Sequence, residues 1–529
     1  MANTRSNTIF QKPVLLKEYW KTDILSGFLV FLLALPLSLG IAKASGFPPA
    51  MGVLTAIVGG IFTFFFNVSE LSIKGPAAGL ITVCASAIVE FGNNENAWKI
   101  TCAAIVIMAV MQIVFGLLKF GRLSDFFPRT AVRGMLAAIG LIIIAKQFPV
   151  LLGINPMEYS GKTIFELYHN IPNYLLNLEF ISTIIGVATL CLMFLMPLIK
   201  FKYIKKIPAP VIALIVSIIY SSALELKNIN SDFLLVKIDN IFNNLDLNID
   251  LSAISTFTFW KYVFIFLIIS SLESILTVKA IDALDEKKRT SNYNGDLIGQ
   301  GFGNFISGLL GGLPMISEVV RSTSNISFGA KSKWSNFFHG LFLLLSMLLF
   351  TPLIELIPNA TLAAMLIYAG YRLAAPEEFI KTFYIGKEQI IVYLTTITLT
   401  LAEDLLIGIF GGILMKFIFH LINGAEIKDF FKAKITITEN NDIAKKLTLE
   451  GIAVFSNIIA YKKILSQIKF EKSMELDFGK VKIVDHSFLN FIEQFKIESK
   501  RNNKEIIISG LENLTPTSNH PLATRVLKK

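Results

Sequence analysis

Long apolar stretches alternate with short polar ones over the first four-fifths of the chain. The apolar stretches, numbered here as spans 1 to 14, cover residues 23–43, 48–67, 76–90, 98–119, 130–149, 177–199, 207–224, 258–283, 295–312, 316–328, 336–357, 359–372, 387–403 and 405–424. A helix needs about 20 apolar residues to cross a bilayer, and most of these stretches approach that length. The pattern predicts an α-helical polytopic membrane protein with 14 spans.

Two of the spans are short and begin at glycine and proline. Span 3 opens at Gly75-Pro76, and span 10 opens at Gly312-Leu313-Pro314. The helices that follow would be about 21 Å and about 16 Å long, whereas the hydrocarbon layer is about 30 Å thick. Each helix would therefore leave its first N–H groups and its positive dipole end inside the membrane, where they can hold an anion. The alternative is a kinked span whose polar groups only satisfy one another.

The two short spans hold matching positions if the chain consists of two halves of seven spans. Interrupted spans at corresponding positions of two halves indicate the midplane binding site of a transporter. An odd number of spans in each half gives the two halves opposite topology. We therefore predict a seven-plus-seven inverted repeat in which the two helix N-termini face each other.

Two ionisable side chains lie deep in the spans. Glu273 and Thr277 of span 8 are four residues apart, on one helix face. A carboxylate inside a membrane costs at least about 2.5 kcal/mol and indicates function, here binding of H⁺ or Na⁺, unless it pairs with Arg321 or Lys74. Arg321 of span 10 can hold an oxyanion through two parallel hydrogen bonds, or it can pair with Glu318.

Further polar and small residues are consistent with a binding site inside the membrane. Pro36 in span 1 frees a backbone carbonyl and allows Ser38 to turn into a cavity, although it can also be a plain kink. We expect Lys43 to extend to the membrane interface and Lys74 to add a second positive charge near the site. Four glycines predict close packing of span 9: Gly299, Gly301, Gly303 and Gly308.

Composition and charge give the orientation. Of the 529 residues, 53% are hydrophobic and only 17% are charged, compared with about a quarter charged in soluble proteins. The loops after spans 4, 6, 8 and 10 are basic and the opposite loops are acidic, which predicts cytoplasmic termini in the cell inner membrane. This placement explains the net charge of +10 without nucleic acid, and the first twenty residues lack the features of a signal peptide.

After residue 423 the pattern changes. Apolar and polar residues alternate at 435–438, 447–449, 473–478 and 505–508, with helical patterns at 455–468 and 487–501. This predicts a small cytoplasmic α/β domain.

The three cysteines lie in apolar stretches and the five histidines have no ligand spacing, so we predict neither disulfides nor a metal centre. No nucleophile–base set or phosphate loop is present, so we predict that the protein is not an enzyme.

Several ordered motifs together resemble the SulP inorganic-anion transporter family, which includes sulfate permeases and bicarbonate transporters. The motifs are DILSGFLVFLLALPLSLGIAKASG, SIKGPAAGLITV, ESILTVKAIDAL, SNYNGDLIGQGFGNFISGLLGGLP, VRSTSNISFGAKS and IPNATLAAMLIYAGYRL. The C-terminal part is similar to a STAS domain through VFSN, ELDFGKVKIVDHS and NHPLATR.

The resemblance implies a core domain of spans 1–4 and 8–11 and a gate domain of spans 5–7 and 12–14. It implies an elevator-like motion, a homodimer in the lipid membrane, and three regions at residues 1–21 (N-terminal segment), 22–425 (transmembrane domain) and 430–529 (STAS domain). The substrate residues would be Ser38, Ala77, Ala78, Glu273, Thr277, Val320, Arg321 and Ser322. Glu273 and Thr277 would also hold the coupling ion, and no cofactor is implied apart from Na⁺ in that role.

Three departures from the family pattern matter. Span 3 begins with Lys74-Gly75-Pro76-Ala77-Ala78 in place of the usual glycine-serine/threonine motif. Sodium-coupled bicarbonate members carry an aspartate where Glu273 stands, which leaves the coupling ion open. In phosphorylated STAS domains a serine follows the loop aspartate; here Asp485 is followed by His486, which argues against a phosphorylation switch.

The sequence thus predicts a secondary active importer of a small inorganic oxyanion, bicarbonate or sulfate, driven by H⁺ or Na⁺. A dicarboxylate or nucleobase permease is the alternative among transporters. An anion channel or a membrane sensor that signals to a cytoplasmic partner through the STAS domain is the alternative of another class.

Overall fold

The computed structural model describes most of the chain. The described residues are 16–66, 68–92, 94–121, 126–159, 162–198, 209–226, 234–236, 249–287, 289, 291–403, 405–440, 444–468, 470, 472–501 and 504–527. The first fifteen residues and much of the predicted basic and acidic loops at 199–208 and 227–248 lie outside these ranges. The predictions for those loops and for the start of the N-terminal segment therefore stay predictions.

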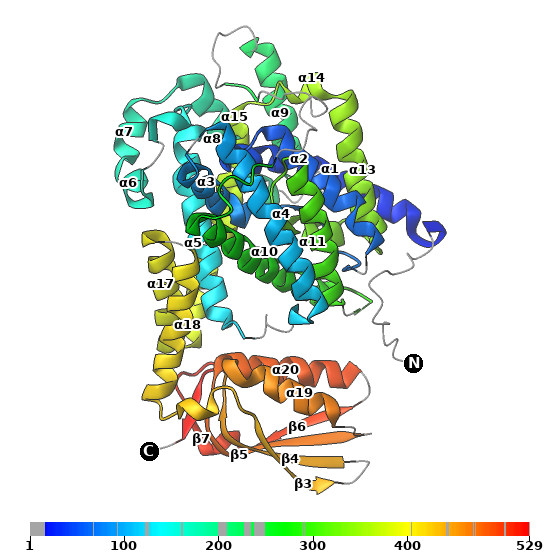
Figure 1. Ribbon diagram of the computed structural model, residues 1–529, viewed down its shortest axis with the longest axis vertical. Coiled ribbons are helices and arrows are strands. Elements are labelled where there is room, and N and C mark those ends of the chain that lie inside the picture. Colours follow the sequence, from blue (N-terminus) through cyan, green and yellow to red (C-terminus); the bar gives the residue numbers. More distant parts are fainter. Residues whose placement is uncertain are drawn as a thin grey trace. The chain divides into compact units, whose positions relative to one another are not determined.

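Every predicted apolar stretch contains a helix (Figure 1). In the first half these are α1 (Leu16–Ala44), α2 (Pro49–Ile61), η2 (Ala78–Leu80) with α3 (Ile81–Glu90), α4 (Glu95–Leu117), α5 (Arg129–Leu151), α8 (Phe180–Leu195) and α9 (Ala209–Ala223). In the second half they are α10 (Phe257–Leu284), α11 (Tyr293–Leu309), α12 (Val319–Ser327), α13 (Trp334–Leu349), α14 (Thr351–Ile354), α15 (Asn359–Leu373), α17 (Lys387–Ala402) and α18 (Leu405–Ile422).

Helix length distinguishes two kinds of predicted span. Within the described residues, five helices are long and apolar enough to cross a membrane: Glu18–Ala44, Asn96–Leu117, Arg129–Leu151, Phe180–Leu198 and Phe257–Asp282. The other predicted spans form shorter or broken helices. The number of fourteen spans and the inverted repeat therefore stay predictions, while the helical character of all the stretches is confirmed.

Three short helices lie outside the predicted spans. They are α6 (Ile164–His169), α7 (Ile171–Leu176) and α16 (Pro376–Ile385). Helix α6 begins with a capping box between Thr163 and Glu166, and α16 begins with a proline in its first turn. They have only six, six and ten residues, too few to register in a search for spans, although the start signals of α6 and α16 are visible in the sequence.

Glycines allow α11 to pack closely, as predicted. A Cβ on Gly301 would lie 3.0 Å from the carbonyl oxygen of Ala109 in α4, and one on Gly308 would lie 2.9 Å from Val106 of the same helix. A Cβ on Gly299 would lie 2.7 Å from Val68. Larger side chains would push the helices apart, so the glycines set the position of α11, which carries Asp296 at its start.

The C-terminal part forms a mixed sheet with two main helices. Its strands are β3 (Lys434–Asn440), β4 (Ala444–Ala453), β5 (Ser473–Val484), β6 (Glu505–Ser509), β7 (Leu514–Pro516) and β8 (Arg525–Leu527). The strand order is β3-β4-β5-β8-β7, and β6 pairs with β5. Helices α19 (Ile458–Gln467) and α20 (His486–Arg501) lie side by side against it (Figure 1). The predicted alternation of strands and helices is confirmed.

The chain forms two compact units. One unit consists of residues 1–121 and 139–373, and the other consists of residues 122–138 and 374–529. The second unit thus contains the start of α5, the helices α16 to α18 and the C-terminal sheet. The predicted anion site belongs entirely to the first unit.

Candidate functional site

Two three-residue strands bring the interrupted spans together. Strand β1 (Lys74–Pro76) precedes η2 and α3, and β2 (Met315–Ser317) precedes α12. The strands pair in antiparallel fashion, with Lys74 opposite Ser317 and Pro76 opposite Met315. The prediction that the two glycine-proline turns meet is therefore confirmed. Because the strands are antiparallel, the chain leaves the pair at opposite ends toward the two following helices.

The η2–α3 side presents backbone groups. Neither Ala77, the N-cap of η2, nor Leu80, the N-cap of α3, provides a side-chain hydrogen bond to the helix start. Ala77 is fully buried and Ala78 is half-buried. Because no side chain caps this end, its N–H groups and dipole remain available to an anion.

The α12 side is already capped. Glu318 is the N-cap, and its Oε2 accepts a hydrogen bond of 2.6 Å from the backbone N–H of Arg321. Ser322 has a structural role, because its hydroxyl accepts from the N–H of Ile73 at 2.9 Å and thereby ties α12 to the segment before β1. Val320 is only half-buried. Of the residues predicted here, Arg321 is the one with unused donors.

Arg321 is completely buried at 0% exposure. Among the described residues, Nε and both Nη atoms have no hydrogen-bond partner, and Nε lies 4.0 Å from Oε2 of Glu318. The guanidinium lies against Gly75 of β1, where a Cβ would collide with it. A buried guanidinium that donates no hydrogen bond is costly, which marks this position as functional.

Glu273 of α10 faces the start of the other half-helix at Gly79. A Cβ on Gly79 would lie 2.5 Å from Oε2 and 2.6 Å from Oε1 of Glu273, so the absence of a side chain at Gly79 makes room for the carboxylate. Within the described residues, Glu273 Oε2, Thr277 Oγ1 and Ser38 Oγ are all buried without a hydrogen-bond partner. A carboxylate oxygen without a partner can take up a proton, and carboxylate and hydroxyl oxygens are groups of the kind that bind Na⁺.

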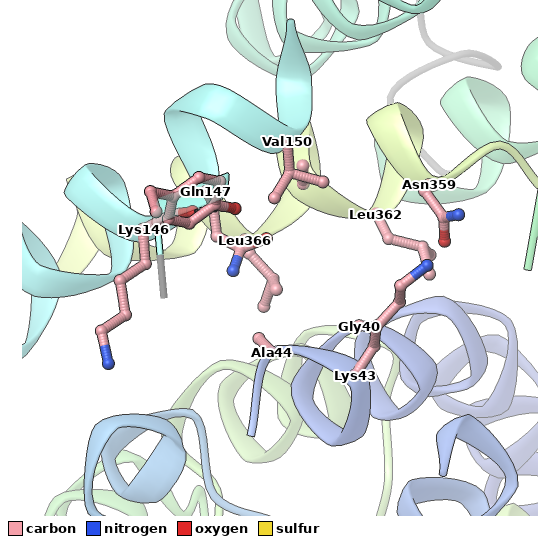
Figure 2. A pocket seen from close by; sticks show the side chains of 11 residues that line it. Gly40, Lys43, Ala44, Lys146, Gln147, Val150, Asn359, Leu362 and Leu366 are labelled. Carbon is pink, nitrogen blue, oxygen red and sulfur yellow. Dashed lines mark hydrogen bonds between the residues drawn. The ribbon is translucent and has the colours of Figure 1, made fainter. Parts of the chain in front are cut away.

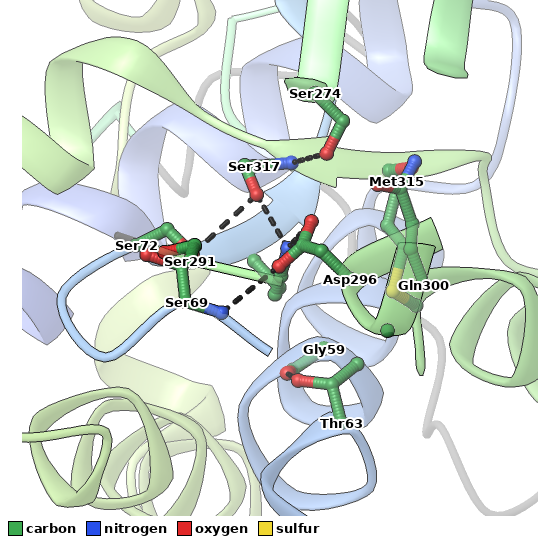
Figure 3. A network of polar contacts seen from close by, with 12 residues as sticks. Gly59, Thr63, Ser69, Ser72, Ser274, Ser291, Asp296, Gln300, Met315 and Ser317 are labelled. Atoms are coloured by element: carbon green, nitrogen blue, oxygen red, sulfur yellow. Dashed lines mark hydrogen bonds and ion pairs between the residues drawn. The ribbon is translucent and has the colours of Figure 1, made fainter. Parts of the chain in front are cut away.

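Lys74 does not add a positive charge to the site, contrary to our expectation. Its Nζ lies 2.6 Å from Oδ2 of Asp296 and 2.5 Å from Oγ of Ser317, and both charged residues are buried. Asp296 also accepts from the N–H of Ser69 at 3.1 Å, and the N–H of Ser317 donates to Ser274 at 3.0 Å (Figure 3). The lysine is neutralised by Asp296, and this network fixes β1 and β2 to α10 and α11.

A cavity of about 100 Å³ lies beside α1, one to two turns beyond Ser38. Figure 2 shows that side chains of α1, α5 and α15 surround it. The polar residues that line it are Lys43, Lys146, Gln147, Tyr159 and Asn359. Lys43, which we expected to extend to the membrane interface, instead lines this cavity. The cavity separates a predicted core helix, α1, from two predicted gate helices.

In the second unit, buried polar contacts connect the last helices with the C-terminal sheet. Lys416 of α18 forms an ion pair with Glu388 of α17, and His420 Nε2 lies 3.2 Å from Oδ2 of Asp485. Burial raises the pKa of Asp485, but the hydrogen bond with His420 and the charge of Lys416 outweigh burial and hold this pKa at about 2. Burial lowers the pKa of His486 to about 4.

The roles of two residues were missed in the sequence. Asp296 lies in a small polar segment that indicated helix packing, and its pairing with Lys74 across 222 residues left no local signal. Glu318 was considered only as a partner of Arg321. Glutamate is not among the preferred N-cap residues, so only the structure identifies Glu318 as the N-cap of α12.

Comparison with known proteins gives consistent matches. A model of the Sulfate permease family matches residues 20–396. The "Putative sulfate transporter YvdB" of Bacillus subtilis (strain 168) is 25% identical over 510 residues, which cover 94% of this chain and 92% of the relative. The bicarbonate transporter BicA of Picosynechococcus sp. is 24% identical over 436 residues, which cover 81% and 74%.

Two solved structures share the fold. The transmembrane domain of a cyanobacterium bicarbonate transporter BicA has a TM-score of 0.65 at 21% identity, covering 77% of this chain and 100% of that one. The structure of SLC26A9 has a TM-score of 0.67 at 13% identity, covering 94% and 85%. The second match extends over the C-terminal sheet as well as the helices.

Proposed function

Because the chain belongs to the Sulfate permease family, we propose that it is a secondary active importer of a small inorganic oxyanion, bicarbonate or sulfate. Relatives named for each of these two anions cover most of the chain. The observation that carries the proposal is the β1–β2 pair, which joins two interrupted helices at a buried position. The helix start that follows β1 has no side-chain cap, and the guanidinium of Arg321, whose donors are unused among the described residues, lies against Gly75 of β1.

In this proposal the anion binds at the start of η2 and α3. The N–H groups around Ala77 and Ala78 donate to its oxygen atoms, and Ser38 of α1 adds a hydroxyl whose Oγ has no partner among the described residues. Arg321 contributes its positive charge from beside β1. A small oxyanion with several oxygen atoms suits such a set of separate donors better than a halide does.

Glu273 supplies the coupling. Its carboxylate lies against Gly79 at the start of the same half-helix, so its negative charge opposes an entering anion. A proton or a Na⁺ ion held by Glu273 and Thr277 removes that repulsion, and anion and cation then bind together. We expect Glu273→Gln to transport without dependence on either ion gradient, because the neutral amide mimics the protonated acid.

This expectation is checked by uptake into proteoliposomes under an imposed H⁺ or Na⁺ gradient, with counterflow as the measure of intact folding. The exposed acid Glu403 provides the control variant Glu403→Gln. Gradient-driven uptake that persists unchanged in Glu273→Gln contradicts the assigned role. Loss of counterflow in Glu403→Gln would mean that the assay reports folding rather than coupling.

Alternating access completes the proposal. We propose an elevator-like movement of the core domain, with α1, against the gate domain, with α5 and α15, in a homodimer of the inner membrane with cytoplasmic termini. The cavity beside α1 supports a boundary at this place, because it is lined from both groups of helices. Gly40 also brings α1 close to α15, since a Cβ there would lie 3.3 Å from Leu366.

Counterflow of labelled substrate tests the proposal. Proteoliposomes loaded with unlabelled bicarbonate, sulfate, succinate or uracil are diluted into the same labelled compound. Transient accumulation of bicarbonate or sulfate is expected. Accumulation of succinate or uracil alone would instead identify a dicarboxylate or nucleobase permease. Equilibration without accumulation would indicate a channel, and no flux of any compound would favour a sensor.

A further inference from the structure

The two half-helices differ in what occupies their N-termini. The start of η2 and α3 has no side-chain cap, whereas the start of α12 holds the carboxylate of Glu318 through the N–H of Arg321. A carboxylate at this position is stabilised by the helix dipole in the same way as a bound anion. The chain itself therefore supplies an anion to one of the two positive helix ends.

Glu318 balances the charge of Arg321 without satisfying its hydrogen-bond donors. Its Oε2 lies 4.0 Å from Nε, which is beyond hydrogen-bond distance, and the side chain of Arg321 is 0% exposed. All three guanidinium nitrogens lack a hydrogen-bond partner among the described residues. An arginine that is buried, charge-balanced and still able to donate leaves room for a ligand that would bond to it directly.

The charges around Arg321 favour a competition between Glu318 and an entering anion. Glu318 acts electrostatically on both Arg321 and Glu273. Lys74 and Asp296 cancel each other. Among the described residues, the charges of Glu273, Glu318 and Arg321 then act on one another, and these three groups carry an excess negative charge when both acids are ionised. An anion enters more readily if one of the two carboxylates leaves or is neutralised.

We propose that Glu318 is a tethered competitor of the substrate: it occupies the N-terminus of α12 when the site is empty, and an entering oxyanion displaces it. The inference rests on the proposed function of this site. Glu318 has the means to move, because its side chain is flexible and 12% exposed and the adjacent Val319 is 39% exposed. Displacement would free the N–H and the guanidinium of Arg321 for the anion.

Two substitutions separate the charge of Glu318 from its capping role. Serine is a preferred N-cap residue whose hydroxyl can accept from the same N–H, so Glu318→Ser keeps the cap and removes the competing carboxylate. Glu318→Gln keeps the size and removes the charge. The matched control is Glu179→Gln at the N-cap of α8, where the carboxylate accepts from the N–H groups of Ile181 and Ser182 at 3.1 Å and 2.5 Å.

Affinity is measured on the full chain in detergent by thermal stabilisation with sulfate and with bicarbonate. We expect Glu318→Ser and Glu318→Gln to bind the anion that the unaltered protein binds at least about tenfold more tightly, a gain of about 1.4 kcal/mol. Glu179→Gln should leave the affinity unchanged. Transport should slow in both Glu318 variants, because release of the anion is no longer assisted by the returning carboxylate.

The two possible failures are distinguishable. If the unaltered protein binds an anion and both Glu318 variants bind it equally or more weakly while melting normally, the competition is refuted and the proposed function stands. If neither the unaltered protein nor any variant binds or exchanges an inorganic anion, the proposed function is refuted, and this inference falls with it.

Discussion

The buried ion pair between Lys74 and Asp296 offers a quantitative test of the site's architecture. The two atoms lie 2.6 Å apart, and the side chains are 0% and 1% exposed. Removing one partner of such a pair costs about 3–5 kcal/mol, because the other charge stays buried without compensation. Lys74→Met and Asp296→Asn should therefore each destabilise the protein by about this amount.

The double variant should be more stable than either single one. With Lys74→Met and Asp296→Asn together, neither position carries a buried charge, and the amide oxygen at position 296 can still accept from the N–H of Ser69. Independent effects would add to about 6–10 kcal/mol, whereas we expect a loss of about 1–3 kcal/mol for the pair. The difference is the coupling energy between the two residues.

Thermal unfolding of the solubilised full chain measures the stability of the unaltered protein, the two single variants and the double variant. Each single variant should melt up to about 10 °C lower, and the double variant should recover most of that loss. The control pair is Lys261 and Glu90, which are 3.0 Å apart but 30% and 41% exposed, and single and double substitutions there should each change stability by less than about 1 kcal/mol. Additive losses at the buried pair, or losses no larger than in the control, would refute the reasoning.

Two further predictions concern the anion and the C-terminal unit. Arg321→Gln should weaken sulfate binding more than bicarbonate binding, because the lost positive charge acts twice as strongly on a divalent anion; equal losses in a thermal-stabilisation titration would contradict its electrostatic role. His486 has a folded-state pKa of about 4, below the unfolded value of about 6.5, so the unfolded chain takes up the proton first as the pH falls. Stability should therefore drop by about 3 kcal/mol between pH 6.5 and pH 4. His486→Gln should lose this part of the pH dependence and the exposed His169→Gln should keep it; identical melting profiles of the two variants would be evidence against it.

The helices and the soluble sheet were predictable because their signals are local. Apolar patterning predicted a helix in every apolar stretch, and alternation predicted the strands around Leu447 and Leu476. The meeting of the two glycine-proline turns was also predictable, since Pro76 and Pro314 hold matching positions if the chain consists of two halves of seven spans. The α6, α7 and α16 helices escape a search for spans because they are only six, six and ten residues long.

The partners inside the site were not predictable, because pairing between distant segments leaves no periodic pattern. Lys74 lies near the site in sequence, and only the fold shows that Asp296 neutralises it. In the same way, the proximity of Glu273 to Gly79 depends on the packing of α10 against the half-helix. The sequence showed which charged side chains lie in apolar stretches. Only the packing shows which of them keep hydrogen-bonding groups or charge available for a ligand.

The β1–β2 pair also constrains how the protein is made. Lys74 and Ser317 are 243 residues apart, so a ribosome working at about 5–20 residues per second delivers the second strand about 12–50 s after the first. During that time the nascent first half holds a strand with unpaired backbone groups and a lysine without its aspartate. Biogenesis should therefore depend on the insertion machinery or a chaperone that shelters this half until the later helices arrive.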